Sequence, residues 1–250
     1  MSEGTPKVVF VVPYRDREKQ QTFFRKHMQY ILEDIPANDY KIYFIHQKDA
    51  RGFNRGAMKN IGFLAMKEKY PDTYQTITFV FNDVDTMPMV KDEFVYATKP
   101  GVIKHFYGFR YTLGGIVSIT GEDFERINGF PNFWGWGYED NALQTRAEKN
   151  NIVIDRSKFY PLLDKNVIHL QDGVIRIVND KEAKRYHWGT QEGFRDIRGL
   201  TYSIEGDMVN VTAFETATVE QKASTRPYDM RTKTNPFSKR TAKAMKMHMV

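Results

Sequence analysis

The chain has 250 residues, 41% of them hydrophobic and 14% aromatic, which is enough for one large domain or two small ones around a sizeable core. It contains no cysteine, so disulfides, cysteine metal ligands and cysteine nucleophiles are excluded. The net charge is +6, and residues 226–250 carry all of it, because they hold seven lysine and arginine side chains against one aspartate.

The N-terminus shows no signal-peptide pattern, and no segment is apolar over the ~20 residues that a membrane-spanning helix needs. The lack of cysteine is compatible with a reducing compartment. We therefore expect a soluble, unsecreted protein of the cytoplasm without a transmembrane segment.

Three apolar runs early in the chain predict buried strands, at residues 7–13, 40–46 and 76–81. Two segments with apolar residues at helical spacing, residues 17–34 and 54–69, lie between these runs. The alternation of strand and helix is typical of the α/β class, in which an open, mainly parallel sheet is flanked by helices. Ligands bind to such sheets at the carboxyl ends of the strands.

The rest of the chain is less regular, and we expect residues 86–113 and 170–190 to be largely irregular or loop-like. Further expected elements are strands at residues 113–119, 152–154 and 165–169, helices beginning at Thr120 and spanning residues 139–149, and a hairpin of residues 200–204 and 208–214. We predict a single domain over residues 1–225, followed by a flexible basic tail over residues 226–250.

The acidic segment Asp83-Val84-Asp85 follows the third predicted strand directly. Two aspartates at positions i and i+2 of an extended chain point the same way, and at a strand end they can hold one divalent ion between the protein and a diphosphate. Carboxylate and phosphate oxygens suit Mn²⁺ or Mg²⁺. His169 ends a later predicted strand and is either a further metal ligand or a structural histidine.

Three arginines lie near the ends of predicted strands. Arg15, Arg17 and Arg55 can pair with phosphate groups. For each of them taken singly, an ordinary surface salt bridge is the alternative. Asn54 is suited to cap the following helix, and a helix that begins there directs backbone N–H groups toward an anion.

Residues 129–141 contain two tryptophans, several glycines and an acidic pair. Trp134 and Trp136 offer flat apolar faces with a polar edge. Glu139 and Asp140 begin a predicted helix, where the helix dipole favours carboxylates. The segment is interpreted either as a tryptophan corner in the core or as an aromatic platform that holds a sugar beside a catalytic carboxylate.

Six motifs together indicate a family. They are PYRDR (13–17), FNRGAMKNIGF (53–63), FVFNDVDTMPM (79–89), LGGIVSIT (113–120), INGFPNFWGWGYED (127–140) and DIRGLTY (196–202). In their order and spacing they resemble the β-1,4-galactosyltransferase family, which has a GT-A fold and uses a nucleotide sugar with Mn²⁺. The resemblance covers nearly all of residues 7–215, and the tryptophan motif is its most specific part.

The resemblance implies a GT-A type, Rossmann-like single domain and an inverting transfer of galactose or N-acetylgalactosamine from a UDP-sugar to a hydroxyl of a glycan or glycoconjugate acceptor. It implies Mn²⁺ as cofactor, with Mg²⁺ as the alternative. Because the chain lacks cysteine and a membrane anchor, it looks like a soluble microbial or viral member, located in the host cytoplasm or the virion if it is viral.

The resemblance also implies roles for individual residues. The residues that match donor contacts are Pro13, Tyr14, Arg15, Asp16, Arg17, Phe53, Asn54, Arg55, Asp83, Val84, Asp85, Gly115 and Trp136. The residues that match acceptor contacts are Tyr138, Glu139, Asp140 and Asn141. The implied metal ligands are Asp85 and His169, and Asp140 stands at the position of the catalytic base.

Some positions depart from the family pattern. Asn141 stands where the acidic run usually continues. The third protein ligand of the metal is Asn166, Gln171 or neither, because both the methionine and the second histidine that different branches use are replaced. Thr112 stands where many members have a tyrosine that narrows the donor pocket, so we expect UDP-GalNAc to be accepted as well as, or instead of, UDP-galactose.

Two other functional classes stay open: a different metal-dependent nucleotide-processing enzyme, and a non-catalytic module that binds glycan or nucleic acid. The basic tail can contact an anionic membrane surface or nucleic acid. Deleting residues 226–250 separates these classes, because we expect a transferase to keep its turnover and a nucleic-acid binder to lose its binding.

Overall fold

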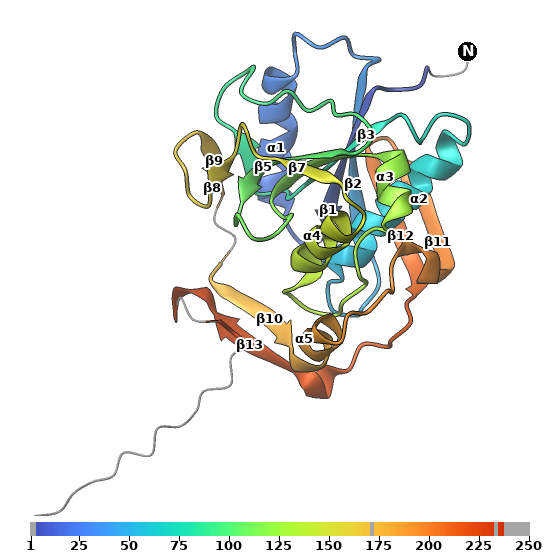
Figure 1. Cartoon of the computed structure of the whole chain (residues 1–250), viewed down its shortest axis with the longest axis vertical. Coiled ribbons are helices and arrows are strands. Elements are labelled where there is room, and N and C mark those ends of the chain that lie inside the picture. Colours follow the sequence, from blue (N-terminus) through green and yellow to red (C-terminus); the bar gives the residue numbers. More distant parts are fainter. Residues whose placement is uncertain (1–3, 171–172, 233–234, 238–250) are drawn as a thin grey trace, which may run out of the picture.

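Figure 1 shows the computed structural model of the chain, which describes residues 4–170, 173–232 and 235–237. The helices are α1 (Glu18–Ile31), α2 (Arg55–Lys69), α3 (Gly121–Arg126), α4 (Glu139–Lys149) and α5 (Asp180–His187), with short 3-10 turns η1 (Phe194–Asp196), η2 (Lys222–Ser224) and η3 (Met230–Thr232). The strands are β1 (Val8–Tyr14), β2 (Tyr40–Gln47), β3 (Thr78–Asn82), β4 (Thr86–Pro88), β5 (Val102–Gly108), β6 (Ile116–Thr120), β7 (Val153–Asp155), β8 (Tyr160–Pro161), β9 (Val167–His169), β10 (Ile175–Asn179), β11 (Arg198–Glu205), β12 (Met208–Glu215) and β13 (Thr225–Asp229). Within these ranges, no helix combines the length and the apolar character that crossing a membrane requires.

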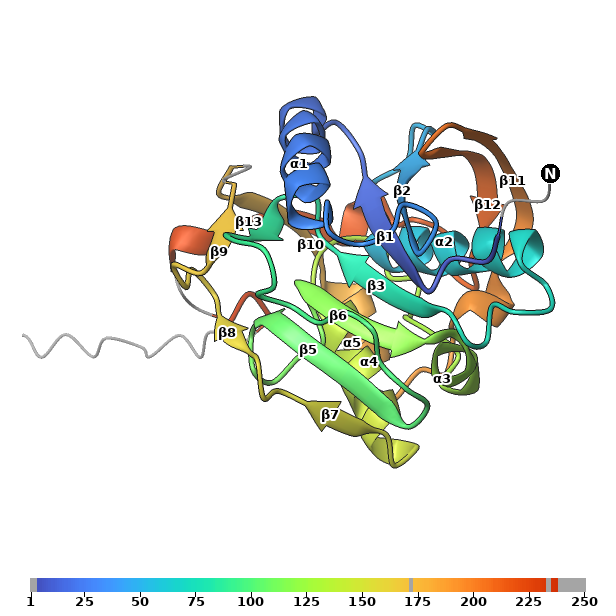
Figure 2. The same ribbon diagram turned by 90° about the horizontal axis from the view of Figure 1, so that it is seen from above.

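The centre of the molecule is a large sheet with the strand order β11-β12-β2-β1-β3-β6-β5-β7 and with β8 beside β5 (Figure 2). Strands β12, β2, β1 and β3 are parallel neighbours, and β5 is parallel to β7 and β8. Strand β6 runs antiparallel to β3 and β5, and β11 runs antiparallel to β12. The predicted mainly parallel sheet is therefore confirmed, and β11 and β12 form the predicted hairpin.

Strand β1 is buried on both faces, which explains why its sequence has no polar alternation. Val9 and Val11 point into one hydrophobic cluster, and Phe10 and Val12 point into the other, because successive side chains of a strand point to opposite faces. Residues of α2, α3 and α4 pack in the first cluster, and residues of α1 pack in the second. The sheet thus lies between two layers of helices, as the α/β prediction requires.

The predicted strand–helix connections meet at one edge of this sheet. Since β1, β2 and β3 are parallel neighbours, their carboxyl ends lie side by side. Arg15 follows β1, and Asp83 follows β3. Helix α2 begins after β2, and Asn54 caps it, because the Asn54 side chain accepts a hydrogen bond from the Ala57 N–H at 2.9 Å. The N-cap prediction for Asn54 is confirmed.

Two segments that were expected to be irregular contain regular structure. Strand β5 lies within residues 86–113, and its Lys104 and His105 interrupt the apolar run by which a strand is recognised. Strand β10 and helix α5 lie within residues 170–190, where Asn179 caps α5 by accepting from the Lys181 N–H at 3.0 Å. The partner of β10 is β13, which comes about fifty residues later, so local pattern alone does not indicate the pairing.

The boundary between domain and tail was expected at residue 226, but this position lies inside β13, which pairs antiparallel with β10. The predicted flexible tail is therefore wrong for residues 226–232, which belong to β13 and η3. Residues 233–234 and 238–250 of the expected tail lie outside the described residues. Strands β10 and β13 and helix α5 lie together at one end of the molecule (Figure 1).

Candidate active site

A cavity of about 310 Å³ lies where the carboxyl ends of β1, β2 and β3 meet the tryptophan segment. Most of the predicted donor residues line it, namely Pro13, Arg15, Arg17, Phe53, Arg55, Asp83, Val84, Asp85 and Trp136. Trp134, which the sequence analysis interpreted as a core or platform residue, also lines it. The sequence did not single out the other lining residues for this site, which are Gly52, Gly135, Ile175, Arg176, Ile177, Glu220 and Thr225. Another hollow, of about 380 Å³, lies at the opposite ends of β1 and β3 and contains none of the predicted residues.

Four predicted donor residues do not line the cavity. Tyr14 is buried and packs edge-on against Phe44. Asp16 is exposed, Asn54 is fully buried in its capping position, and the Gly115 carbonyl accepts a hydrogen bond from the Asp83 N–H at 3.1 Å. Asn54 and Gly115 thus do not face the cavity, but they hold the backbone of residues that do.

Arg15 uses its guanidinium to hold a neighbouring loop. It donates hydrogen bonds to the carbonyl oxygens of Arg51 and Asp49, the latter at 2.7 Å. This loop leads into Phe53, which also lines the cavity. Arg15 therefore uses two of its N–H groups to hold the loop that forms the cavity wall, and these groups do not bind a phosphate.

The two aspartates of the Asp83-Val84-Asp85 segment face different partners. Asp83 pairs with Arg55, with 2.6 Å between Oδ1 and Nη2. Asp85 faces His169, with 3.9 Å between Asp85 Oδ2 and His169 Nε2. Strand pairing brings this second pair together, because Thr86 of β4 lies opposite His169 of β9.

The Asp85–His169 pair fits a divalent ion. Ligand atoms 3.9 Å apart can both bind one ion at about 2.1 Å, and carboxylate and imidazole are both ligands for first-row metals. Tyr107 orients the imidazole from the other side, since its hydroxyl lies 2.9 Å from His169 Nδ1.

No third protein ligand joins this pair within the described ranges, where no group of three or more histidine, aspartate or glutamate side chains is placed to hold a metal ion. The Asn166 amide donates to Asp164 at 3.0 Å, and Gln171 lies outside the described residues. An ion held here would take its remaining ligands from phosphate oxygens or water.

A cluster of two cations and three carboxylates lies beside the cavity. Arg55 and Lys59 are one turn apart on α2, and both face the carboxylates. Arg55 contacts Asp83 and lies 3.8 Å from Glu139, and Lys59 Nζ donates to Asp140 Oδ1 at 3.0 Å. Helix α4 begins with Glu139 and Asp140, as predicted, so its dipole also favours the two carboxylates.

The members of this cluster differ in acidity. Burial alone would lower the pKa of Arg55, but the carboxylates of Asp83, Glu139 and Asp140 raise it above its ordinary value. Burial alone would raise the pKa of Asp83, but Arg55 and then Lys59 hold it below its usual range. Burial and the adjacent Asp140 raise the pKa of Glu139. Asp83 is therefore fixed as an anion, whereas Glu139 is more easily protonated than an ordinary glutamate.

The two tryptophans of the motif have different roles. Trp134 is buried, stacks on Phe214 and donates from Nε1 to the Thr218 carbonyl at 2.9 Å. Trp136 is partly exposed at the cavity, and its backbone N–H donates to the Ile177 carbonyl of β10 at 2.7 Å. The core interpretation is thus confirmed for Trp134, and the platform interpretation of Trp136 stays a prediction.

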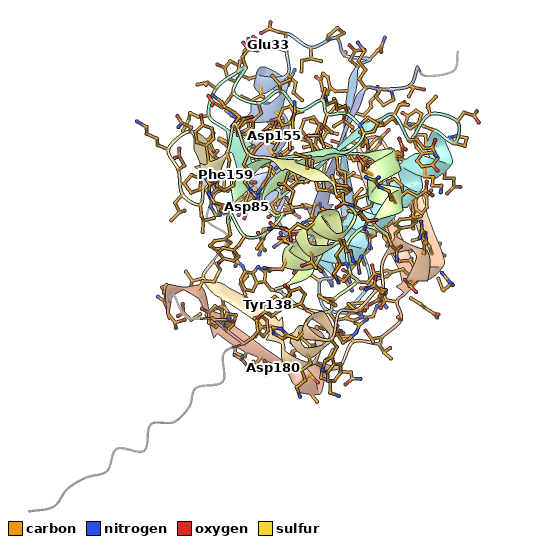
Figure 3. The ribbon with its side chains drawn as sticks, viewed as in Figure 1. Glu33, Asp85, Tyr138, Asp155, Phe159 and Asp180 are labelled. Carbon is orange, nitrogen blue, oxygen red and sulfur yellow. The ribbon has the colours of Figure 1, made fainter. Side chains whose placement is uncertain are left out.

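Tyr138, the first of the predicted acceptor residues, lies toward α5 (Figure 3). Tyr138 stacks on Tyr186 of α5, with ring centroids 4.4 Å apart. Phe237, near the end of the described chain, packs against the same ring at 4.7 Å. Asn141 is at hydrogen-bond distance from the Tyr111 carbonyl, at 3.5 Å.

A buried network holds the segment that touches Asp140. The Leu113 N–H donates to the Asp140 carbonyl at 3.1 Å, and Gly114 lies directly against the Asp140 carboxylate. His105 contacts the Gly114 carbonyl at 3.1 Å and accepts a hydrogen bond from Arg156 at 3.0 Å. His105 and Arg156 thereby fix the backbone of Gly114, which lies beside Asp140.

Several of these residues were missed in the sequence. Lys59 lies within the FNRGAMKNIGF motif at four residues from Arg55, a spacing that places both on one helix face. The alternation in Ile175-Arg176-Ile177 indicates a strand, but the surrounding polar residues obscured it. The network of His105 and Arg156 gives no sequence signal, because its members come from separate strands and loops.

Family models match both parts of this site. The model described as "N-terminal region of glycosyl transferase group 7" matches residues 2–99. A second one, described as "N-terminal domain of galactosyltransferase", matches residues 102–169. Together they span all the predicted site residues.

Individual relatives agree with these models. β-1,4-Galactosyltransferase 4 of Cricetulus griseus is 36% identical over 166 residues, which is 62% of this chain and 46% of that protein. β-1,4-Galactosyltransferase 1 of Mus musculus is 31% identical over 216 residues, 79% of this chain and 51% of that protein. The chain thus spans about half the length of the curated relatives it matches.

Solved structures agree on the fold. The catalytic domain of Drosophila β1,4-galactosyltransferase 7, solved with xylobiose, superposes with a TM-score of 0.61 at 19% identity and covers 86% of this chain and 96% of that one. A mutant of the same enzyme, solved with manganese, UDP-Gal and xylobiose, gives a TM-score of 0.59 at 18% identity. With both family models matched, related sequences at up to 36% identity and a shared GT-A fold, the chain belongs to the β-1,4-galactosyltransferase family.

Proposed function

We propose that this protein transfers galactose from UDP-galactose to a hydroxyl group of a glycan or glycoconjugate, with inversion at the sugar carbon and with Mn²⁺ as cofactor. One observation carries the proposal: a single cavity joins the arginines after β1, the Asp83–Asp85 segment and Trp136, with Asp85 facing His169. A structurally related Drosophila galactosyltransferase was solved with manganese, UDP-Gal and xylobiose, which supports the same donor and cofactor class here.

The donor diphosphate would lie at the strand ends. Arg17 and Arg55 line the cavity there, and backbone N–H groups at the start of α2 point toward the same edge. A guanidinium is suited to bind phosphate oxygens in a bidentate manner. Asp83 keeps Arg55 in place, because the two side chains form an ion pair at 2.6 Å.

Asp85 and His169 would hold the Mn²⁺ ion, and Tyr107 would orient the imidazole. When bound, the ion supplies Lewis-acid stabilisation to the leaving diphosphate. The protein's own part is to keep the two ligand atoms at a suitable spacing.

Asp140 is proposed as the general base. As the acceptor oxygen attacks the anomeric carbon and the bond to the diphosphate breaks, the hydroxyl proton passes to the Asp140 carboxylate, and UDP leaves with the bonding electron pair. Glu139 lies beside it, is buried and approaches Arg55 at 3.8 Å, so it is suited to contact a sugar hydroxyl rather than to receive the proton. Trp136 and β10 cover the cavity and would exclude water, which would otherwise hydrolyse the donor.

The size of Thr112 bears on whether the site accepts a second donor, UDP-GalNAc. Thr112 is buried near the segment that contacts Asp140 and is smaller than the tyrosine expected there. We propose that the site also accepts UDP-GalNAc. Donor-competition kinetics test this, and a complete lack of UDP-GalNAc turnover at saturating concentration would contradict it.

The function itself is tested by UDP release from UDP-galactose, with Mn²⁺ present or chelated, in the presence of β-linked disaccharide acceptors. We expect release that depends on Mn²⁺ and is lost in Asp85→Ala. Asp140→Asn should bind UDP-galactose normally but turn over about 100-fold more slowly or less. A wild-type protein that binds no UDP-sugar would contradict the proposal.

A further inference from the structure

We propose that Lys59 is a positioning residue for Asp140, and that its ammonium group keeps this carboxylate ionised and holds one of its oxygens in place. The inference deepens the proposed function, because it rests on the role of Asp140 as general base. Sequence reasoning assigned no role to Lys59, although it lies within the FNRGAMKNIGF motif.

The pair is short and shielded from solvent. Lys59 Nζ donates to Asp140 Oδ1 at 3.0 Å, and the side chains are 2% and 21% exposed. Lysine is rarely buried this deeply without a charged partner, because the ammonium loses its hydration. Among the described residues, Asp140 is the hydrogen-bonding partner that the structure provides, and the face of the Phe130 ring lies 4.5 Å from Nζ.

The start of α2 is basic. Its first turn contains Arg55 and no acidic residue, although the dipole at a helix N-terminus disfavours cations there, and Lys59 follows one turn later. Such a conflict between local preference and residue type is expected at functional sites. Here the carboxylates of Asp83, Glu139 and Asp140 compensate for it.

The electrostatic need for a cation at this point is clear. Glu139 and Asp140 are adjacent carboxyl groups, and their mutual repulsion disfavours the state in which both are ionised. Lys59, after Arg55, helps to hold the pKa of Asp83 below its usual range, and it opposes the rise that burial and Asp140 give to the pKa of Glu139, so its charge reaches both groups. The same charge, in direct contact with Asp140, favours the ionised form that a general base needs.

The contact also orients the carboxylate. Lys59 binds Oδ1, and Oδ2 lies against Gly114, where a Cβ atom would collide with it. The carboxyl group is thus fixed between an ammonium on one oxygen and a backbone surface beside the other.

The test compares three variants of the full chain. Lys59→Met removes the charge and keeps a similar length, and Lys59→Arg keeps the charge. Lys67→Met is the matched control, since Lys67 is on the same helix but pairs with Glu125 away from the cavity. For each, we would measure kcat and KM for UDP-galactose across pH and follow the Asp140 carboxyl carbon by NMR titration, with Asp140→Asn to assign the signal.

We expect Lys59→Met to leave KM for UDP-galactose unchanged. The acid limb of its kcat profile should move to higher pH by about one unit, so that at pH values on the acid side of the profile its kcat is about tenfold lower than that of the wild type. The NMR midpoint of Asp140 should move in the same direction. Lys59→Arg should retain the wild-type profile, and so should Lys67→Met.

An unchanged pH profile together with an unchanged NMR midpoint in Lys59→Met would overturn the inference. If Lys59→Met fails to fold, the NMR midpoint and pH profile of Lys59→Gln decide in its place. Failure of the proposed function looks different: the wild type would then transfer no galactose at any pH. In that case the positioning role of Lys59 in catalysis is overturned as well, whatever the NMR titration shows.

Discussion

The backbone N–H of Trp136 donates to the carbonyl oxygen of Ile177 at 2.7 Å, which joins the tryptophan segment to strand β10. Strand β10 is paired on its other side with β13, near the C-terminus. The position of Trp136 over the cavity therefore depends on residues almost one hundred positions later in the chain. This connection changes what a C-terminal deletion should do.

We predict that deleting residues 225–250 lowers turnover strongly, whereas deleting residues 238–250 leaves it close to that of the full chain. The first deletion removes β13, and a lone strand without its ladder partner is not stable. Strand β10 would then release the Trp136 segment. The sequence alone led to the opposite expectation for a cut at residue 226, because it treated the whole basic segment as a tail.

Steady-state kinetics of both truncations, with Tm measured alongside, check this prediction. The longer deletion should raise KM for the acceptor and the donor together, since Trp136 and Thr225 both line the cavity. Equal activity of the two truncations would show that β13 does not hold the tryptophan segment.

A second prediction concerns Gly114. A Cβ atom at this position would collide with Asp140 Oδ2 and lie 2.8 Å from its Cγ. Gly114→Ala should therefore displace the proposed base and lower kcat by about 100-fold or more, while donor binding persists because the Asp85–His169 pair is untouched.

Calorimetric titration with UDP-galactose and Mn²⁺, next to turnover measurements, separates binding from catalysis in Gly114→Ala. Gly4→Ala is the matched control, because a Cβ there meets no atom within 4 Å. Normal turnover in Gly114→Ala would mean that the Asp140 carboxylate can move without loss, and that its position is not critical.

The sequence predicted the parts of this fold that local pattern determines. The VVFVV run of β1 is buried on both faces, and the Asn54 cap and the acidic start of α4 follow from side-chain chemistry within a few residues. Strand β5 was missed because Lys104 and His105 interrupt its apolar run. Strand β10 was missed because its partner β13 is distant in the sequence. Local pattern contains no information about such pairings.

The same distinction applies to the site. Motifs placed the arginines, the Asp83–Asp85 segment and Trp136 at one edge, because parallel strands bring their carboxyl ends together. The contacts that fix these residues, such as Lys59 with Asp140, depend on how α2 packs against α4. The roles of Lys59, Tyr107 and His105 become visible only when the distances are known.

A third prediction concerns metal affinity. Tyr107→Phe removes the hydroxyl that lies 2.9 Å from His169 Nδ1, so the imidazole loses its orienting partner. The Mn²⁺ concentration for half-maximal activity should rise by about 10- to 100-fold, as is typical when an outer-shell partner of a metal ligand is removed. Activity at saturating Mn²⁺ should change much less.

Tyr96→Phe is the matched control for Tyr107→Phe. Tyr96 is also a buried tyrosine, and within the described residues its hydroxyl has no hydrogen-bonding partner. Removing that hydroxyl should leave Mn²⁺ dependence unchanged and stabilise the fold by about 1 kcal/mol. If both variants shift the Mn²⁺ requirement equally, the effect is not specific to His169.

The last prediction is a pH dependence of stability that originates at His105. Burial, together with the nearby Arg156 guanidinium, lowers the pKa of His105 to about 4. The folded state therefore binds this proton less readily than the unfolded chain, in which a histidine has its ordinary pKa of about 6.5. The contribution of neutral His105 to stability is fully present above about pH 6.5 and is lost as the pH falls toward about 4.

The size of this effect follows from the shift, since one pKa unit corresponds to about 1.4 kcal/mol, so the loss amounts to about 3 kcal/mol across the window. Urea denaturation at pH values of about 7 and about 4.5 measures it. In His105→Gln the slope over this window should become shallower, because glutamine does not titrate while its amide can still donate to the Gly114 carbonyl. An equally steep slope in that variant would assign the acid sensitivity to other groups.

Because His105 supports Gly114, and Gly114 lies against Asp140, acid in this window should also disturb the proposed base before the whole protein unfolds.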